Sequence, residues 1–220
     1  DIVAMAARRA APQAPTPPSG KRMARSADRV HDALVRGDES SVRQLVRSLV
    51  DEGASIVDVI QDVLVPPLVR IGADWHDGRL TIWVEHRASA IVERLLGELS
   101  PNPRGRRRGT AMVAAVSGDL HSLPTSMAAV VLRDDNWSVE HLGANMPPDE
   151  LVRFCTEHDV DVAVLSSTNP DTAELAADTA RRLRSVGTPV VLGRPGRTLA
   201  DLVVDARAAL ATGVATATTD

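Results

Sequence analysis

The sequence predicts an α + α/β protein, in which a four-helix-bundle cap precedes a doubly wound parallel sheet. Apolar residues recur at the spacing of one helix face from Ser26 to about Leu99, which is typical of a small bundle. A stretch rich in Pro, Gly and Arg at 100–110 then interrupts that pattern. Beyond it, short apolar runs alternate with helical segments through short loops, which indicates a parallel sheet.

The helices of the cap are delimited by glycines and capping residues. Gly37 and Gly53 end the first two helices, and Ser55 caps the third. We expect Pro66 and Pro67 to kink or restart the third helix, because proline lacks the N–H that a helix interior needs. The four expected helices lie at about 26–37, 40–53, 55–71 and 81–99.

The second half reads as a Rossmann-like or flavodoxin-like domain. Continuous apolar runs such as Met112–Val116 are expected for strands buried on both faces. Such sheets bind ligands at the carboxyl ends of their strands, so the loops that follow the strands are the places to search. The expected strands are 112–116, 138–142, 160–165 and 189–192, and the expected helices are 122–133, 147–157, 172–186 and 198–211.

These assignments divide the 220-residue chain into five segments. The proline-rich start is expected to be disordered, and the Ala-Thr repetition after Gly213 to fray. The predicted segments are a tail at 1–24, a cap at 25–100, a linker at 101–110, a Rossmann-like, ligand-binding sheet domain at 111–212, and an end at 213–220.

Composition narrows the classes of function. No apolar run is long enough to span a membrane, and Cys155, the single cysteine, has no partner for an internal disulfide. We therefore expect a cytoplasmic protein with no membrane association. Aromatic residues make up only 2% of the chain, yet Trp75 and Trp83 lie eight residues apart. His31, His141 and His158 are expected in ordinary surface or loop positions.

The loop after the first strand carries the first chemical signal. It has no glycine-rich phosphate fingerprint, which disfavours a nicotinamide or flavin dinucleotide. Asp119 instead precedes His121 by two residues, so its carboxylate could hold one imidazole nitrogen and leave the other free for a metal. Alone, this pair favours the interpretation of a solvated loop histidine over that of a metal ligand.

The spacing of further residues resembles the cobalamin-binding domain of methionine synthase and the mutases. That family shows Asp-x-His-x-x-Gly, 41 residues, Ser-x-Leu or Ser-x-Thr, about two dozen residues, and Gly-Gly. Here 41 residues separate Pro124 from Ser166, and 24 separate Thr168 from Gly193. The resemblance implies a cobalt corrinoid with His121 as its lower ligand, oriented by Asp119, and a nucleotide tail beside Ser166, Thr168 and Gly193. Pro124 and Arg194 replace two of the motif's glycines, which puts the path of the tail in doubt.

The cap resembles that of the adenosylcobalamin photoreceptors of the CarH type. Nine residues separate Trp75 from Glu85, and His86 precedes His121 by 35 positions, as in those photoreceptors. The resemblance implies that Trp75 packs on the upper adenosyl group while Glu85 and His86 hydrogen-bond it. His76 would be the upper cobalt ligand after photolysis. Trp83 stands where the photoreceptors tend to carry a small residue, either as core or as part of the upper face.

The resemblance implies a light sensor rather than an enzyme. In it, photolysis of the Co–C bond would change the cap conformation, the oligomeric state of a dimer or tetramer, or the binding of a signalling protein. Residues 1–24 cannot form a winged helix-turn-helix, so direct DNA binding is not expected. The photocobilins resemble this architecture and also carry a bilin, such as biliverdin, for which the sequence has no diagnostic motif. Two alternatives stay open: a corrinoid methyl carrier of a methyltransferase system, and a cobalamin carrier without signalling.

Overall fold

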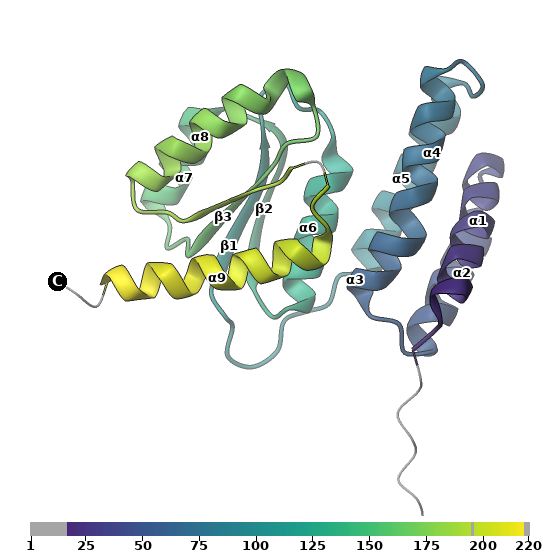
Figure 1. Cartoon of the computed structure of the whole chain (residues 1–220), viewed down its shortest axis with the longest axis horizontal. Helices are drawn as coiled ribbons and strands as arrows, with labels where there is room; N and C mark the ends of the chain where they lie inside the picture. Colours follow the sequence, from purple (N-terminus) through teal and green to yellow (C-terminus); the bar gives the residue numbers. More distant parts are fainter. Residues whose placement is uncertain (1–16, 195, 218–220) are drawn as a thin grey trace, which may run out of the picture.

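The computed structural model describes residues 17–194 and 196–217, and Figure 1 shows a group of helices beside a sheet flanked by helices. This is the expected fold class: a helical cap followed by a Rossmann-like parallel sheet. Among the described residues, no helix is long and apolar enough to cross a membrane.

The cap begins earlier than the sequence predicted. Residues 1–16 of the expected tail lie outside the described part, but helix α1 (Gly20–Arg36) already includes 20–24. Ser19 caps it by accepting a hydrogen bond from the backbone N–H of Arg22, and the buried side chain of Met23 fixes its first turn to the core. The first helix therefore starts before the position expected for it at residue 26, because a cap and one apolar contact suffice to start it.

Four long helices form the cap, as predicted, with a shorter pair of turns leading into the third. These elements are α1, α2 (Glu39–Asp51), α3 (Ile56–Val59), the π-helical turn η2 (Ile60–Leu64), α4 (Val65–His76) and α5 (Ile82–Leu99). Their shared core consists of fully buried aliphatic side chains such as Val30, Leu34, Val46, Leu49, Ile60 and Leu64. His31 is only 8% exposed on α1, so its expected surface position was wrong: it lies one residue after Val30 on the core side of the helix.

The two prolines lie where a new helical segment starts, which agrees with the restart expected there. They occupy the first turn of α4, where a missing N–H costs least, and the π-turn η2 immediately precedes that helix.

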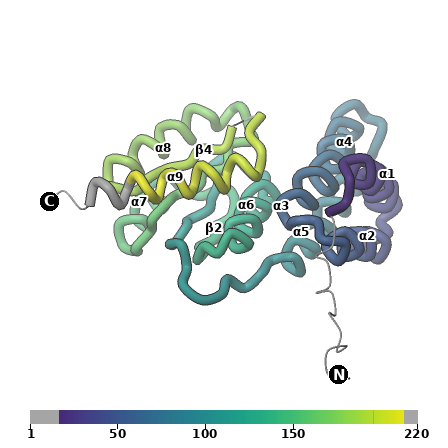
Figure 2. The backbone as a smooth tube through the Cα atoms, turned by 60° about the horizontal axis from the view of Figure 1, so that its bottom comes forward, coloured from purple at the N-terminus to yellow at the C-terminus, as the bar shows by residue number. Residues whose placement is uncertain are grey.

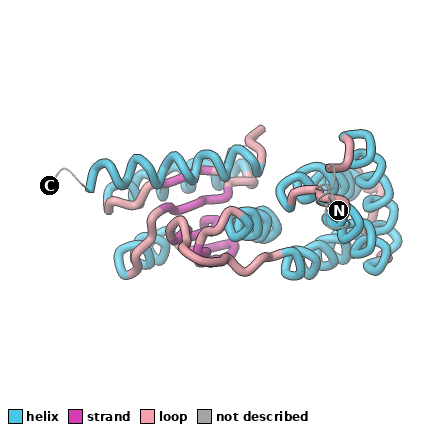
Figure 3. Tube along the Cα trace, turned by 90° about the horizontal axis from the view of Figure 1, so that it is seen from below, coloured by secondary structure: helices cyan, strands magenta, loops and turns pink. Residues whose placement is uncertain are grey.

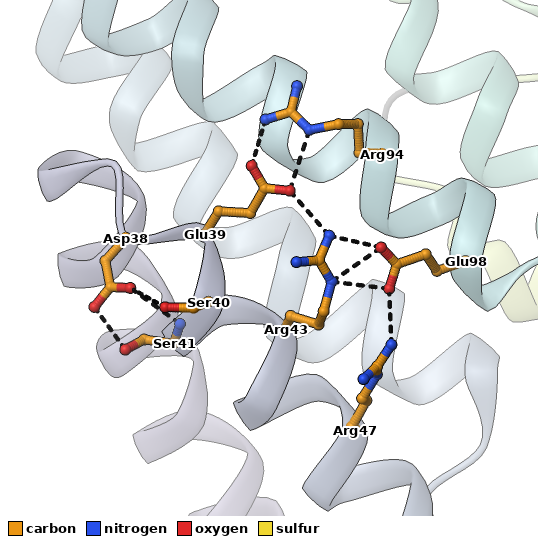
Figure 4. Close-up of polar contacts among 8 residues, drawn as sticks. All are labelled: Asp38, Glu39, Ser40, Ser41, Arg43, Arg47, Arg94 and Glu98. Carbon is orange, nitrogen blue, oxygen red and sulfur yellow. Dashed lines mark hydrogen bonds and ion pairs between the residues drawn. The ribbon is translucent and has the colours of Figure 1, made fainter.

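Ion pairs tie α2 to α5 across the surface of the cap (Figure 4). The guanidinium of Arg43 bonds both carboxylate oxygens of Glu98 and one oxygen of Glu39, at 2.6–2.9 Å. Arg94 of α5 bonds Glu39, and Arg47 bonds Glu98. These groups are partly exposed, so the network fixes the register of the two helices and contributes modestly to stability.

The second part is a four-stranded parallel sheet in the order β2-β1-β3-β4. Its strands are β1 (Thr110–Val116), β2 (Ser138–Met146), β3 (Val162–Ser166) and β4 (Val190–Leu192), and its helices are α6 (Ser122–Asp134), α7 (Pro148–Glu157), the 3-10 turn η3 (Pro170–Thr172), α8 (Ala173–Ser185) and α9 (Leu199–Ala217).

Helices cover both faces of this sheet (Figure 3). Apolar residues of α6 and α9 pack on one face, and those of α7 and α8 on the other. This two-sided packing confirms the doubly wound architecture. Two element ends differ from prediction: β2 continues to Met146, and α9 continues through 213–217, where fraying was expected. Alanine, the strongest helix former, recurs through that last segment; residues 218–220 lie outside the described part.

The apolar core of the cap includes side chains from the sheet domain. Three side chains of α6, Met127, Val130 and Val131, belong to the cap's apolar cluster, and Figure 2 shows α3 and α5 beside α6. Polar contacts reinforce this joint. The Ser126 hydroxyl donates to Glu93 of α5 at 2.6 Å, and the backbone N–H of Leu199 donates to the Gln61 side chain at 3.0 Å. The joint therefore holds α5 against the helix that starts just after His121.

Candidate functional site

His121 lies in the loop between β1 and α6, at the N-cap position of α6. Its Nδ1 is 2.7 Å from Oδ1 of Asp119, and its side chain is 61% exposed while that of Asp119 is fully buried. The expected pairing of these two residues is present in the structure. Nε2 forms no hydrogen bond to any described residue, so one ring nitrogen is held and the other is presented outward.

Hydrogen bonds keep the buried carboxylate of Asp119 ionised. Burial acts to raise its pKa, but hydrogen bonds from the His121 side chain and from the backbone N–H groups of Thr168, His121 and Asn169 outweigh this, and the pKa is lowered. An ionised Asp119 accepts a hydrogen bond from the N–H at Nδ1 of His121, which leaves the Nε2 lone pair free for a metal. This donor set suits a metal that needs one additional nitrogen ligand.

The residues predicted around the nucleotide tail lie at the ends of β3 and β4. Thr168 is connected to the pair above: its backbone N–H and its hydroxyl both lie within 3.1–3.3 Å of the Asp119 carboxylate. Ser166, the last residue of β3, has no hydrogen bond to Asp119 or His121 among the described residues. Gly193 follows β4, and its N–H donates to Leu165 O at 2.8 Å. A Cβ at Gly193 would stand 3.3 Å from that oxygen, so glycine allows the close approach of the two strand ends.

Pro124 is accommodated in the first turn of α6, where the backbone N–H groups have no partner within the helix. The proline at this position therefore leaves the placement of His121 intact. Arg194 is exposed and directly follows Gly193.

The four predicted cap residues lie at the turn between α4 and α5. Trp75 is 44% exposed in the last turn of α4, and His76 ends that helix. Glu85 and His86 lie in the first turn of α5, with Glu85 Oε2 3.1 Å from His86 Nδ1. Ser89 also donates to Glu85, at 2.8 Å, and orients the carboxylate. No hydrogen bond or ion pair in the described part joins these four residues to His121.

The turn that carries the cap residues lies at the same end of the molecule as the carboxyl ends of the strands (Figure 1). His86 and Glu93 are seven residues apart on α5, which places them on one face of the helix. Because Glu93 contacts Ser126 of α6, this face of α5 is the one toward the sheet domain.

Exposed apolar side chains surround this end of the molecule, and sequence reasoning had missed several of them. Leu120, between Asp119 and His121, is 74% exposed, and Ile82 at the start of α5 is 41% exposed. The sequence did offer a signal for their exposure: Leu120 is an apolar residue in a polar loop, and Ile82 is an apolar residue at the start of a helix. Trp83 is 58% exposed with the Arg87 guanidinium 5.0 Å from its ring, so it is not a core residue.

Comparison with known proteins decides the family. Two family models, both described as a B12 binding domain, match residues 26–100 and 109–219. The chain belongs to the B12-binding domain family. This membership supports cobalamin binding, and the single outward imidazole nitrogen, the buried carboxylate behind it and the cradle at Gly193 fit such a cofactor.

Several B12-binding relatives are similar over about 60% of the chain. A corrinoid protein of Desulfitobacterium hafniense is 24% identical over 141 residues, 61% of this chain and 65% of its own length. The HTH-type transcriptional repressors CarH and CarA of Myxococcus xanthus are 34% and 32% identical over 136 and 139 residues, 60% of this chain. The matched region spans only 45% and 43% of those two repressors.

A solved structure shows the same fold. The monomethylamine corrinoid protein of Methanosarcina barkeri superposes with a TM-score of 0.67 at 16% identity, over 86% of this chain and 98% of that one. The likeness confirms the helical cap joined to a Rossmann-like domain.

Proposed function

We propose that the chain is an adenosylcobalamin-dependent light sensor in which His121 is the lower cobalt ligand. The observation that carries this proposal is the group formed by exposed Trp75, His76 and His86 and half-buried Glu85 near the α4–α5 turn, which keeps the spacing of the CarH-type photoreceptors. The CarH and CarA repressors at 34% and 32% identity support it. When bound, adenosylcobalamin supplies a cobalt–carbon bond that light breaks.

The cap residues have properties that suit the upper side of such a cofactor. Trp75 offers a half-exposed aromatic face for packing, and the Glu85 carboxylate, held by Ser89, is a fixed hydrogen-bond acceptor. His76 ends α4 beside the turn at 77–81, so its imidazole can move without breaking a helix interior. We propose His76 as the upper ligand after illumination. The readout would be a change in cap conformation, in the state of a homo-oligomer or in the binding of a signalling protein.

The proposal is tested by loading the protein with adenosylcobalamin in the dark. Absorption and mass in solution are then measured before and after illumination. We expect a permanent change in the absorption spectrum and a change in oligomeric state. His121→Ala should lose the spectrum of imidazole-ligated cobalamin, whereas the control His158→Ala, an exposed histidine at the end of α7, should keep it.

Other outcomes distinguish the alternatives. Unchanged absorption and mass after illumination would overturn light sensing. Binding of methylcobalamin but not adenosylcobalamin would favour the alternative of a corrinoid methyl carrier of a methyltransferase system. A red-shifted band on addition of biliverdin would establish a second chromophore.

A further inference from the structure

The loop that carries Asp119 and His121 is held from the side of β2 by one asparagine. Asn145 Oδ1 accepts a hydrogen bond from the backbone N–H of Gly118 at 2.9 Å. In the other direction, the backbone N–H of Asn145 donates to the carbonyl of Asp119 at 3.0 Å. The two bonds hold Gly118 and Asp119, which precede His121 by three and two residues.

The backbone of β2 is shaped to present this side chain. The pairing of β2 with β1 shifts register twice, between Val113 and Ala114 and between Ala114 and Val116. Within this irregular stretch Gly143 has φ 81° and Asn145 has φ 58°, both left-handed. Asn is among the few residues with a side chain that tolerate this conformation, and bulges of this kind re-aim side chains beside functional sites.

A second asparagine holds the same loop from the side of β3. The Asn169 side-chain amide donates to the carbonyl of Gly118 at 3.3 Å, and its backbone N–H donates to Asp119 Oδ2 at 3.3 Å. Gly118 itself is left-handed, at φ 88°, and a Cβ there would come within 3.1 Å of Thr172. Both backbone polar groups of Gly118 are thus occupied by asparagine side chains, one from β2 and one from the loop that follows β3.

We propose that Asn145 is a positioning residue for cobalt: by fixing Gly118 and Asp119 it sets where the free nitrogen of His121 points. The side chain of Asn145 is exposed and touches neither Asp119 nor the imidazole through its own atoms, so it acts through the loop. This inference rests on the proposed role of His121 as lower ligand. Asn169 holds the same two residues, Gly118 and Asp119, from the side of β3; we call these hydrogen bonds of Asn145 and Asn169 the bracket.

Two substitutions separate the side-chain bond from the backbone shape. Asn145→Gly keeps the left-handed backbone but removes the acceptor, while Asn145→Asp keeps an acceptor oxygen. Asn136→Gly is the matched control, because Asn136 is also left-handed, at φ 68°, but lies in the loop between α6 and β2. Each variant is loaded with cobalamin and reduced to the Co(II) form, and nitrogen splitting in its electron paramagnetic resonance spectrum reports imidazole ligation.

We expect Asn145→Gly to raise the fraction without nitrogen splitting and to weaken cobalamin binding on the order of tenfold, a typical effect of losing a group that orients a metal ligand. Asn145→Asp should restore both, and Asn136→Gly should match the wild type. In the ligand-free protein, exchange of the Gly118 amide should accelerate on the order of tenfold in Asn145→Gly, while that of Ala114 in β1 stays unchanged.

The ligand-free measurement separates this inference from the proposed function. If the wild type bound no cobalamin, the proposed function would fall, and Gly118 exchange would still decide whether Asn145 holds the loop. Faster Gly118 exchange with wild-type nitrogen splitting would overturn the claim that the bracket positions His121. Unchanged exchange in Asn145→Gly would overturn the bracket itself.

Discussion

At the scale of single residues, His121 and Asp119 divide two tasks. The exposed imidazole presents a nitrogen outward, and the buried carboxylate determines which nitrogen that is. A solvated imidazole populates two tautomers and rotates freely, whereas this one has Nδ1 committed to an ionised acceptor. The cost of burying that acceptor is offset by N–H and O–H donors from the β3 loop, so the ligand geometry depends on two neighbouring strands.

Cys155 on α7 is also buried, but its pKa is raised, whereas that of Asp119 is lowered. Burial raises the pKa of its thiol to about 11, with a hydrogen bond from Thr188 acting in the other direction. We expect alkylation of Cys155 in the folded protein at pH 8 to be on the order of 100-fold slower than for free cysteine, because the thiolate is the reactive form. Mass spectrometry after iodoacetamide, with and without urea, measures this. A new thiol in Val186→Cys, at a 44% exposed position, is the control and should react at the ordinary rate.

The raised pKa of Cys155 also determines how its contribution to the free energy of unfolding changes with pH. The folded thiol holds its proton more tightly than the unfolded one, so its contribution to the free energy of unfolding is complete below the ordinary pKa near 9. That contribution is lost as pH rises toward about 11. Rapid alkylation of Cys155 in the folded state at pH 8 would contradict both statements.

The pair at the centre of the site was predictable from sequence, and its supports were not. Asp-x-His spacing and the Ser-x-Thr position lead to Asp119, His121 and Thr168, and the structure connects all three. Asn145 could not be found, because its role depends on a register shift and a left-handed φ that a single sequence does not reveal. The exposure of Leu120 likewise depends on the conformation of its loop, which the sequence alone does not give.

At the scale of elements, the end of α1 depends on a residue of α5. Gly37 has φ 76°, and its N–H bonds the last turn of α1, as expected for a glycine that ends a helix. Beside it, the Arg87 guanidinium donates to the carbonyl of Val35 at 2.8 Å and lies under Trp83. The end of α1 and the exposed tryptophan of α5 therefore share one side chain.

We expect Gly37→Ala to lower the free energy of unfolding by more than about 1–2 kcal/mol, the ordinary cost of a left-handed alanine. The additional loss arises because a Cβ at this position would stand 2.5 Å from Cζ of Arg87 and would displace it from Val35. Urea unfolding measures the change. Gly187→Ala is the matched control: φ is 89° there, and no atom lies within 4 Å of the added Cβ. Equal losses in the two variants would show that Arg87 moves at no cost.

Element types followed well from periodicity, and element ends less well. Apolar spacing predicted the cap helices and all four described strands, since each pattern reports a face that must be buried. The start of α1 and the end of β2 were not predicted, because the first depends on one capping residue and the second on one bulge. The π-turn before Pro66 is equally local and leaves no periodic trace.

At the scale of the whole molecule, one helix joins the cap to the sheet domain. Met127, Val130 and Val131 of α6 face the cap's apolar cluster, while Ala128 and Leu132 of the same helix pack on the sheet. One helix therefore contributes to both cores, and loosening it affects both sides.

We expect a single unfolding transition in urea, with the amides of α1 and β1 exchanging through the same global opening. Val131→Ala should lower the free energy of unfolding by roughly 2 kcal/mol and should speed the exchange of both elements equally. Val204→Ala, at a 62% exposed position on α9, should change neither. Two separate transitions, or faster exchange in α1 alone, would show that the cap unfolds by itself.

The shared helix also sets the rules for building chimaeras from this family. A cap excised at residue 100 would leave its apolar cluster uncovered where Met127, Val130 and Val131 had closed it. A cap grafted from a relative would meet an α6 shaped for a different partner. Exchangeable caps will therefore be those transferred together with the matching face of α6, so that the cap and the sheet domain are inherited as a pair.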